Sequence, residues 1–236
     1  MNINKQAPEA RDTKHDGMYL DVHSVFSTIQ GEGPFCGEPA VFVRLAGCNL
    51  QCPGCDTDYT NGRTRYDIGD IVKLIESEKI KTGSTTSLVV ITGGEPFRQM
   101  INSFVELLLA NAYRVQIETN GSMPLPRDFS QLPTVVCSPK TAKLHPSVLH
   151  RANAFKYVMK AGNVNPDDGL PLQALDHRAT PFIARPPRNF KGKIYLQPMD
   201  EQDAGYNQGN IQQVVESCMK HGYTLQLQVH KYIGVE

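Results

Sequence analysis

Residues 40–57 read AVFVRLAGCNLQCPGCDT, an apolar, β-branched run followed at once by three cysteines. The run Ala40–Leu45 is typical of a buried strand. The cysteines Cys48, Cys52 and Cys55 have the spacing C-x3-C-x2-C, and the Pro and Gly between them predict a loop. A loop can turn three thiols toward one centre, whereas successive side chains of a strand point to opposite faces. This stretch therefore predicts a strand that ends in a sulfur-rich binding loop.

Segments of helical and strand character alternate along the rest of the chain. Apolar residues at i, i+3, i+4 and i+7 predict helices over residues 68–75, 101–108 and 211–218, with Gly222 where a C-cap belongs. Runs of β-branched or aromatic residues predict further strands at Leu88–Thr92, Arg114–Thr119, Thr134–Cys137, Phe155–Met159, Lys193–Gln197 and Thr224–His230. This alternation favours βαβ units around a parallel sheet, and hence an α/β fold.

Two of the predicted strands carry polar residues at every second position. Gln116 and Glu118 alternate with Val115 and Ile117, and residues 224–230 alternate in the same way. In a curled sheet the polar face could line the interior, with reactive groups gathered at the carboxyl ends of the strands. Alternatively, it is the wet face of a surface strand. For residues 224–230 both interpretations stay open.

The bulk composition indicates one globular domain that acts on a small molecule. The 236 residues fit a single barrel-type domain, and 24 Lys and Arg balance 24 Asp and Glu. A zero net charge provides no electrostatic argument for nucleic-acid or membrane partners. Residues 1–17 contain no hydrophobic stretch, so we expect a polar, poorly ordered N-terminal extension before a domain over residues 18–236, in the cytoplasm. Residues 161–192 are rich in Pro, Gly and Asp and predict an irregular excursion.

The cysteine spacing indicates a metal centre with an open position. Iron–sulfur clusters usually take four thiolates, and the local motif supplies three, which leaves one coordination position for a bound molecule. The alternative is a zinc site completed by a distant His or Cys. Zinc sites of this kind usually come as paired C-x2-C units, and this chain has no second pair. The remaining cysteines, Cys36, Cys137 and Cys218, are interpreted as structural.

A second motif makes the cysteine loop recognisable. The strand predicted at residues 88–92 ends in Thr92-Gly93-Gly94-Glu95-Pro96. Together with C-x3-C-x2-C, this turn resembles the radical S-adenosylmethionine (SAM) superfamily. The resemblance implies a [4Fe–4S] cluster whose open iron is chelated by SAM, and a glycine turn that approaches the SAM amino group. By itself, the Gly-Gly-Glu-Pro sequence could be no more than a tight turn.

A narrower resemblance covers nearly the whole chain after residue 17. The chain is similar to the 7-carboxy-7-deazaguanine synthase family in segments at residues 30–33, 42–48, 55–57, 117–121, 138–140, 196–199 and 230–232. The resemblance implies conversion of 6-carboxy-5,6,7,8-tetrahydropterin to 7-carboxy-7-deazaguanine with loss of ammonia, for queuosine-type 7-deazapurines. It implies a partial (β/α) barrel of about six parallel strands, catalytic SAM, Mg²⁺, an electron donor such as flavodoxin, and a homodimer.

The same resemblance assigns roles to individual residues. Cys48, Cys52 and Cys55 would hold the cluster, and the Thr57 hydroxyl would bind Mg²⁺. Contacts to SAM are implied for Asp56, Gly94, Glu95, Glu118, Ser138, Lys140, Gln197, Pro198, Met199 and Asp200. Contacts to the pterin are implied for Ile29, Gln30, Gly31, Glu32, Arg44, Thr92, His230 and the terminal carboxylate of Glu236. No protein acid or base is implied, because a radical derived from SAM removes the pterin hydrogen.

Several assignments have plainer alternatives. Arg44 could form a salt bridge inside a barrel, Gln30–Glu32 could be a surface turn, and Thr57 could cap a loop. Val229 and Glu236 stand where relatives often have Thr and Pro. Three rival functions share some of these features, namely a glycyl-radical activase, a zinc-binding module, and a degenerate relative that binds another protein.

Overall fold

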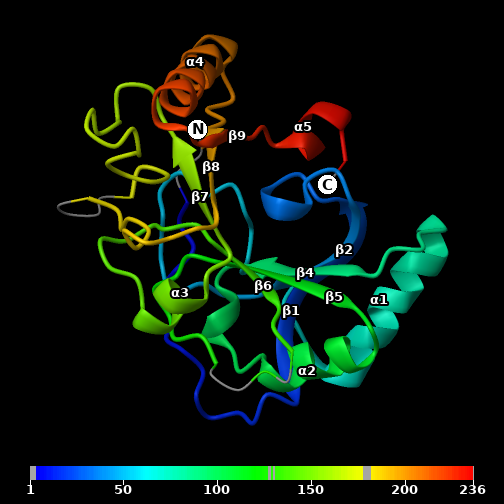
Figure 1. The fold of residues 1–236 in the computed structure, drawn as a ribbon. Coiled ribbons are helices and arrows are strands. Elements are labelled where there is room, and N and C mark those ends of the chain that lie inside the picture. The colour runs from blue at the N-terminus through cyan, green and yellow to red at the C-terminus, as the bar shows by residue number, and fades with distance from the viewer. Residues whose placement is uncertain (1–3, 127–128, 130, 178–181, 236) are drawn as a thin grey trace.

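A single twisted sheet organises the computed structural model, which describes residues 4–126, 129, 131–177 and 182–235. Within these residues the strand order is β3-β1-β2-β4-β5-β6-β7-β8-β9 (Figure 1). The strands are β1 Tyr19–Ile29, β2 Pro39–Leu45, β3 Thr64–Asp67, β4 Leu88–Gly93, β5 Arg114–Thr119, β6 Thr134–Cys137, β7 Ala154–Met159, β8 Lys193–Pro198 and β9 Thr224–Leu225. The helices are α1 Ile68–Thr82, α2 Asn102–Ala110, α3 Pro146–Arg151, α4 Ala204–His221 and α5 Val229–Ile233, with 3-10 turns at Gly33–Phe35 and Pro96–Arg98.

The sheet confirms the α/β fold class and the partial barrel. From β2 through β4 to β9, each strand is parallel to its neighbours, whereas β1 is antiparallel to both β2 and β3. β3 and β9 are the two edges of the sheet in the described residues, so the barrel is not closed. Because the parallel strands all point the same way, their carboxyl ends meet along one rim.

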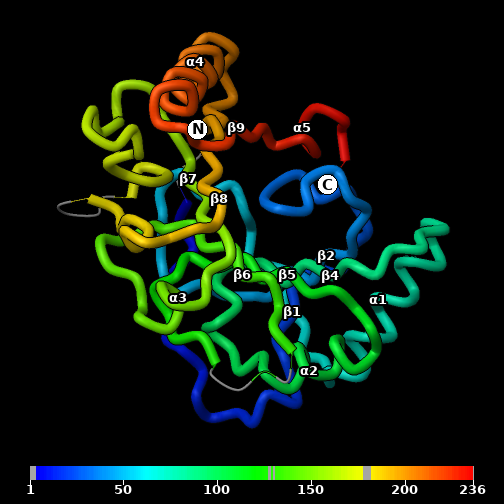
Figure 2. Tube along the Cα trace, in the orientation of Figure 1, coloured from blue at the N-terminus to red at the C-terminus, as the bar shows by residue number. Residues whose placement is uncertain are grey.

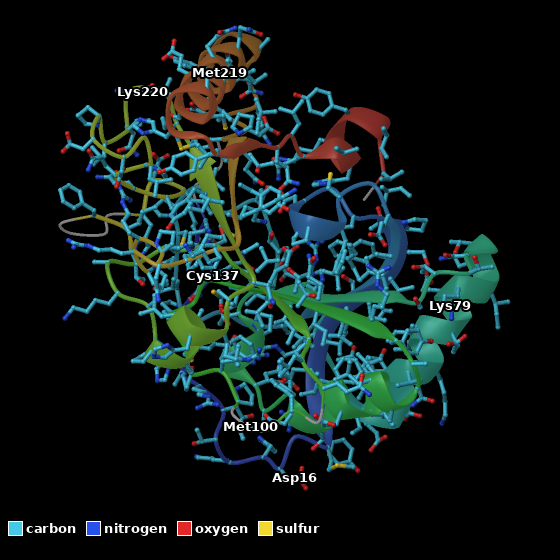
Figure 3. The ribbon with its side chains drawn as sticks, viewed as in Figure 1. Asp16, Lys79, Met100, Cys137, Met219 and Lys220 are labelled. Atoms are coloured by element: carbon cyan, nitrogen blue, oxygen red, sulfur yellow. The ribbon has the colours of Figure 1, made fainter. Side chains whose placement is uncertain are left out.

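The periodic helices form where the sequence predicts them and cover the sheet. α1 begins at Asp67, whose side chain accepts a hydrogen bond from the Gly69 amide, and ends at Gly83 in the left-handed region. Gly222 ends α4 with φ of 74°, as a C-cap glycine should. α1 and α2 lie beside the first half of the sheet, and α4 packs against β8 and β9 (Figure 1). Cys137 is in the interior, whereas Met219 projects from the outer side of α4 (Figure 3).

The predicted strand over residues 224–230 is wrong in its second half. β9 contains only Thr224 and Leu225, and residues 229–233 form α5 instead. Leu225 pairs with Leu196, so a longer strand would soon face Pro198, which has no N–H to donate to the ladder. The Gln228 side chain also turns inward to donate to a buried carboxylate. Strands β1 and β3 were not predicted, because β1 is interrupted by polar residues and a register shift near Ser24.

Two irregular regions have different outcomes. Residues 161–177 and 182–192 contain only bends, turns and isolated bridges, which confirms the expected excursion for the described part. The expectation of a poorly ordered N-terminal extension is wrong for residues 4–12, because their backbone amides bond to the cysteine loop and to the turn after β4. The blue tube at the lower edge of Figure 2 is the end of this N-terminal segment. Across the described ranges, none of the helices is both long and apolar enough to cross a bilayer.

Candidate active site

The carboxyl ends of the parallel strands border a cavity of about 530 Å³. Side chains or backbone from the ends of β2, β4, β5, β7 and β8 line it, and the cysteine loop and α5 complete the wall. This volume is within the range of small-molecule sites. The lining includes most residues that the sequence assigned to cofactor or substrate, together with several that it did not.

All three motif cysteines line this cavity. Cys48 and Cys52 are buried, Cys55 is half-buried, and all three are free thiols. Burial raises the pKa of Cys48 to about 12 and that of Cys52 to about 11, and burial also raises the pKa of Cys55. Because metals bind thiolates, metal loading at this loop must release these protons.

The donor set fits a cluster with three protein ligands. Within the described parts of the chain, no three His, Cys, Asp or Glu side chains lie close enough together to hold one metal ion. A cluster makes a different demand, because its thiolates bind separate iron atoms. Three free thiols that line one roomy cavity fit that demand, and they would supply three of the four ligands that such a cluster usually takes.

The Gly-Gly-Glu-Pro turn packs directly against the cysteine loop. The Gly94 amide donates to the Leu45 carbonyl at 3.2 Å, and the Glu95 amide donates to the Gly47 carbonyl at 3.0 Å. A Cβ on Gly93 would lie 2.1 Å from the Leu45 carbonyl oxygen, and one on Gly94 would lie 2.1 Å from that of Gly47. Only glycine permits this approach, so the turn and the cysteine loop form one unit.

Glu95 joins this unit to β5 and does not line the cavity. Its carboxylate is fully buried and accepts hydrogen bonds from the Thr119 hydroxyl and the Asn120 amide, each at 2.7 Å, and from the Phe97 amide at 3.1 Å. Burial raises the pKa of Glu95 to about 7, although the hydrogen bond from Asn120 opposes the rise. Two residues of the turn were assigned to SAM. Gly94 lines the cavity, whereas Glu95 lies outside the lining and connects the turn to the end of β5.

Arg44 presents a charged group to the cavity from β2. Its guanidinium carbon lies 5.3 Å from the centre of the Phe26 ring, and its Nε atom is buried without a hydrogen-bond partner among the described residues. This geometry differs from the salt bridge considered as its alternative role. A guanidinium with a free Nε donor suits a planar anion such as a carboxylate.

A buried ion network lies beside Arg44. Lys156 Nζ contacts Glu32 Oε2 and lies 3.7 Å from Glu118 Oε2. Burial alone would raise the pKa of Glu32, but the charge and hydrogen bond of Lys156 lower it below its ordinary value. Burial alone would likewise lower the pKa of Lys156, but Glu118 and Glu32 raise it. Lys156 and Glu32 therefore favour each other's charged forms inside the cavity wall.

Glutamine side chains complete this network. Gln197 and Gln228 donate to Glu32 Oε1 at 3.1 Å and 2.9 Å, and Gln30 donates to Glu118 at 3.0 Å. Gln116 and Gln226 are also buried, so the polar faces of β5 and of residues 224–226 point into the barrel. The interior interpretation of the alternating pattern is therefore correct for both segments.

The remaining SAM-assigned residues have mixed positions. Ser138 and Lys140 line the cavity, and Lys140 Nζ donates to the Ser138 hydroxyl at 2.5 Å. Asp56, Glu118, Gln197, Met199 and Asp200 line it too. Pro198 lines a neighbouring cavity of about 200 Å³ instead.

The residues assigned to substrate and Mg²⁺ mostly gather at the same place. Ile29, Gln30, Glu32, Thr92 and His230 line the cavity, as does the half-buried Thr57, whose hydroxyl lies 3.4 Å from Asp56 Oδ1. Gly31 is not in the lining, but it lies against His230, since a Cβ there would meet the His230 ring at 2.1 Å. Glu236 lies outside the described residues.

Two lysines in the lining were missed by sequence reasoning. Lys156 could have been found, because it is a single charge inside the apolar run 154–159. Lys231 lies 3.0 Å from Asp200 and 3.4 Å from Asp56, so it connects α5 to the end of β8 and to the cysteine loop. No local signal in the sequence points to that contact, because its partners are far away along the chain.

Comparison with known proteins identifies the family of the chain. Residues 43–137 match the family model described as the Radical SAM superfamily. The chain is 40% identical over 226 residues to the 7-carboxy-7-deazaguanine synthase of Rhodospirillum rubrum, covering 93% of this chain and 94% of that one. It is 35% identical over 230 residues to the synthase of Rickettsia prowazekii, covering 94% and 91%. The crystal structure of QueE from Escherichia coli superposes with a TM-score of 0.66 and 26% identity, over 89% of this chain and 94% of that one. The chain therefore belongs to the 7-carboxy-7-deazaguanine synthase family of radical SAM enzymes, which use a [4Fe–4S] cluster and SAM.

Proposed function

We propose that the chain converts 6-carboxy-5,6,7,8-tetrahydropterin to 7-carboxy-7-deazaguanine with loss of ammonia, in queuosine-type biosynthesis. The observation that carries the proposal is one cavity lined by three free thiols, a glycine turn and the Arg44 guanidinium, whose Nε has no hydrogen-bond partner among the residues that the structure describes. The names of its relatives supply the product. The residues of this cavity suit a substrate that carries a carboxylate and a polar ring system.

Cys48, Cys52 and Cys55 would hold the [4Fe–4S] cluster, with one iron left free of a protein ligand. When bound, the cluster and SAM together supply a carbon-centred radical that removes one hydrogen atom from the substrate. Gly94 would offer backbone to the SAM amino group, because nothing projects from its Cα into the cavity. Lys140, held by Ser138, would contact an anionic or carbonyl oxygen of SAM. These residues orient the reacting groups and exclude water.

Arg44 would pair with the carboxylate of the pterin. Its contact with the Phe26 ring restricts the Arg44 side chain, so binding a carboxylate would cost little further side-chain entropy. Glu32 and Gln30 would accept and donate hydrogen bonds at the edge of the pterin ring, and His230 would close the cavity from α5. Glu236 is proposed to add its terminal carboxylate to this edge.

Mg²⁺ would bind between Thr57 and oxygens of the substrate. One hydroxyl is a weak magnesium ligand, and Mg²⁺ usually keeps several water or substrate oxygens. The neighbouring Asp56 would attract the cation through its charge. We extend the proposal to a homodimer, an electron donor such as flavodoxin, and the cytoplasm, where clustered free thiols are maintained.

An anaerobic assay of the reconstituted protein tests the reaction. With dithionite, SAM, Mg²⁺ and the carboxytetrahydropterin, we expect mass spectrometry to detect 7-carboxy-7-deazaguanine. Because SAM is regenerated, the amount of SAM lost should be smaller than the amount of product formed. The matched variant Arg44→Lys keeps the positive charge but loses the planar fork, so its KM for the pterin should rise by about tenfold or more. SAM cleavage without a deazapurine product would point to a different radical SAM reaction.

A further inference from the structure

The segment from Asn4 to Asp12 lies across the outer side of the two loops that build the site. In this segment exposure follows a pattern, with Asn4, Gln6 and Glu9 half-buried and Lys5 exposed. Such a pattern is typical of a chain held against a surface by alternate side chains. The catalytic proposal has no use for these residues, and a composition this polar gives them no hydrophobic reason to pack.

The first half of the segment binds the cysteine loop. The Asn4 amide donates to the Pro53 carbonyl at 2.9 Å, and the Asn4 side chain donates to the Cys52 carbonyl at 3.2 Å. Gln6 uses both ends of its side chain, donating to the Thr57 carbonyl at 2.9 Å and accepting from the Tyr59 amide at 2.8 Å. These bonds satisfy backbone groups of a loop that has no regular ladder of its own.

The second half reaches the glycine turn. The Glu9 amide donates to the Cys48 carbonyl at 2.7 Å, and the Glu9 carboxylate lies 3.2 Å from the Arg98 guanidinium. The Arg11 side chain donates to the Phe97 carbonyl at 3.2 Å, and the Asp12 amide donates to the Arg98 carbonyl at 2.7 Å. The segment thus contacts the carbonyls of two cysteines and the 3-10 turn that follows Gly-Gly-Glu-Pro.

The far end of the segment is anchored as well. Gly17 is buried with φ of 81°, and a Cβ on it would lie 2.3 Å from the Met100 carbonyl oxygen. A residue with a side chain would therefore push the chain away from the end of the turn. The segment is held at Asn4 and at Gly17. The residues between them therefore cannot move away from the two loops without breaking these contacts.

We propose that residues 4–12 are a strap that positions the cysteine loop against the glycine turn, with Asn4, Gln6 and Glu9 as its positioning residues. The strap holds the loop in its ligand-ready form before the cluster is present and covers its outer side afterwards. None of residues 4–12 lines the cavity. The inference rests on assigning the three cysteines to the cluster, and it is independent of the identity of the substrate.

Amide exchange in the cluster-free protein tests the strap without any cofactor. In Gln6→Ala the Tyr59 amide loses its acceptor, and its exchange rate should rise about fivefold. Lys5→Ala is the matched control, because Lys5 is the exposed neighbour, and its Tyr59 exchange should equal that of the wild type. A chain lacking residues 1–12 should show exchange more than about tenfold faster across residues 47–60.

Measurements on the loaded protein then separate positioning from simple stability. Gln6→Ala should lose its cluster in air about two- to fivefold faster than the wild type and Lys5→Ala, and the EPR signal of its reduced cluster should change shape. Unchanged Tyr59 exchange in Gln6→Ala, or an unchanged EPR signal and rate of cluster loss, would overturn the strap. A wrong assignment of the cysteines would give a different result. In that case Cys52→Ala would still hold a complete cluster, whatever the effect of Gln6→Ala.

Discussion

Replacing Lys156 with Met removes the lysine that forms an ion pair with Glu32, at nearly constant side-chain volume. The side chains of Lys156 and Glu32 are only 9% and 11% exposed. Breaking a buried pair from one side costs about 3–5 kcal/mol, because the other charge stays buried without compensation. Gln197 and Gln228 still donate hydrogen bonds to Glu32 in the variant. We therefore expect its free energy of unfolding at neutral pH to fall by the lower end of this range, about 3 kcal/mol.

The same variant should reverse a pH dependence. In the wild type the pKa of Glu32 is lowered, so its contribution to stability is present above the ordinary carboxyl pKa and is lost as pH falls below it. Without Lys156, burial dominates and raises the pKa of Glu32 above its ordinary value of 4.5. As the pH is lowered from the raised pKa to the ordinary one, the free energy of unfolding of the variant should then increase by about 1.4 kcal/mol for each pH unit.

Urea unfolding of the cluster-free protein at about pH 5 and about pH 7 measures both effects. Lys193→Met is the control, because Lys193 is an exposed lysine at the start of the neighbouring strand β8. Its unfolding free energy should differ from that of the wild type by less than about 0.5 kcal/mol. A Lys156→Met protein as stable as this control at neutral pH, with no gain on acidification, would refute the buried ion network.

Three further predictions concern the site. Cys52→Ala should abolish formation of 5′-deoxyadenosine, because two thiolates should not retain the cluster; retained product would contradict the assignment. Glu95→Gln should lower the free energy of unfolding by about 1–3 kcal/mol, because an NH2 group must face one of three donors, with fluorescence-detected unfolding as the measurement. Since the pKa of Glu95 is raised to about 7 from 4.5, wild-type stability should also fall as pH rises through that window, and this component should be missing in the variant. Deleting Glu236 should weaken turnover of the pterin more than binding of SAM, and equal effects on both would argue against a substrate role.

Local sequence signals predicted the parts of the site that local chemistry determines. The cysteine spacing and the glycine turn could be identified because both depend on residues close together in the chain. The three periodic helices form as expected, since an apolar stripe must face the sheet. The order of the parallel strands then brings their carboxyl ends together without further information.

Long-range polar contacts could not be predicted in the same way. Lys156 meets Glu32 across 124 positions of the chain, and Gln6 meets Thr57 across 51. No periodicity encodes such a pair. For residues 224–230 a local pattern predicted too much. Their polar side chains do face the interior as the alternation predicts, but the strand ends early because Pro198 in the neighbouring strand β8 cannot continue the hydrogen-bonded ladder.

The central claim is that three thiolates hold an iron–sulfur cube and leave one iron free for SAM. EPR of the dithionite-reduced protein, recorded with and without SAM and combined with iron and sulfide analysis, addresses it most directly. We predict about four irons and four sulfides per chain and a spectrum that shifts when SAM is added. Zinc in place of iron, or a cluster spectrum that SAM leaves unchanged, would contradict the account.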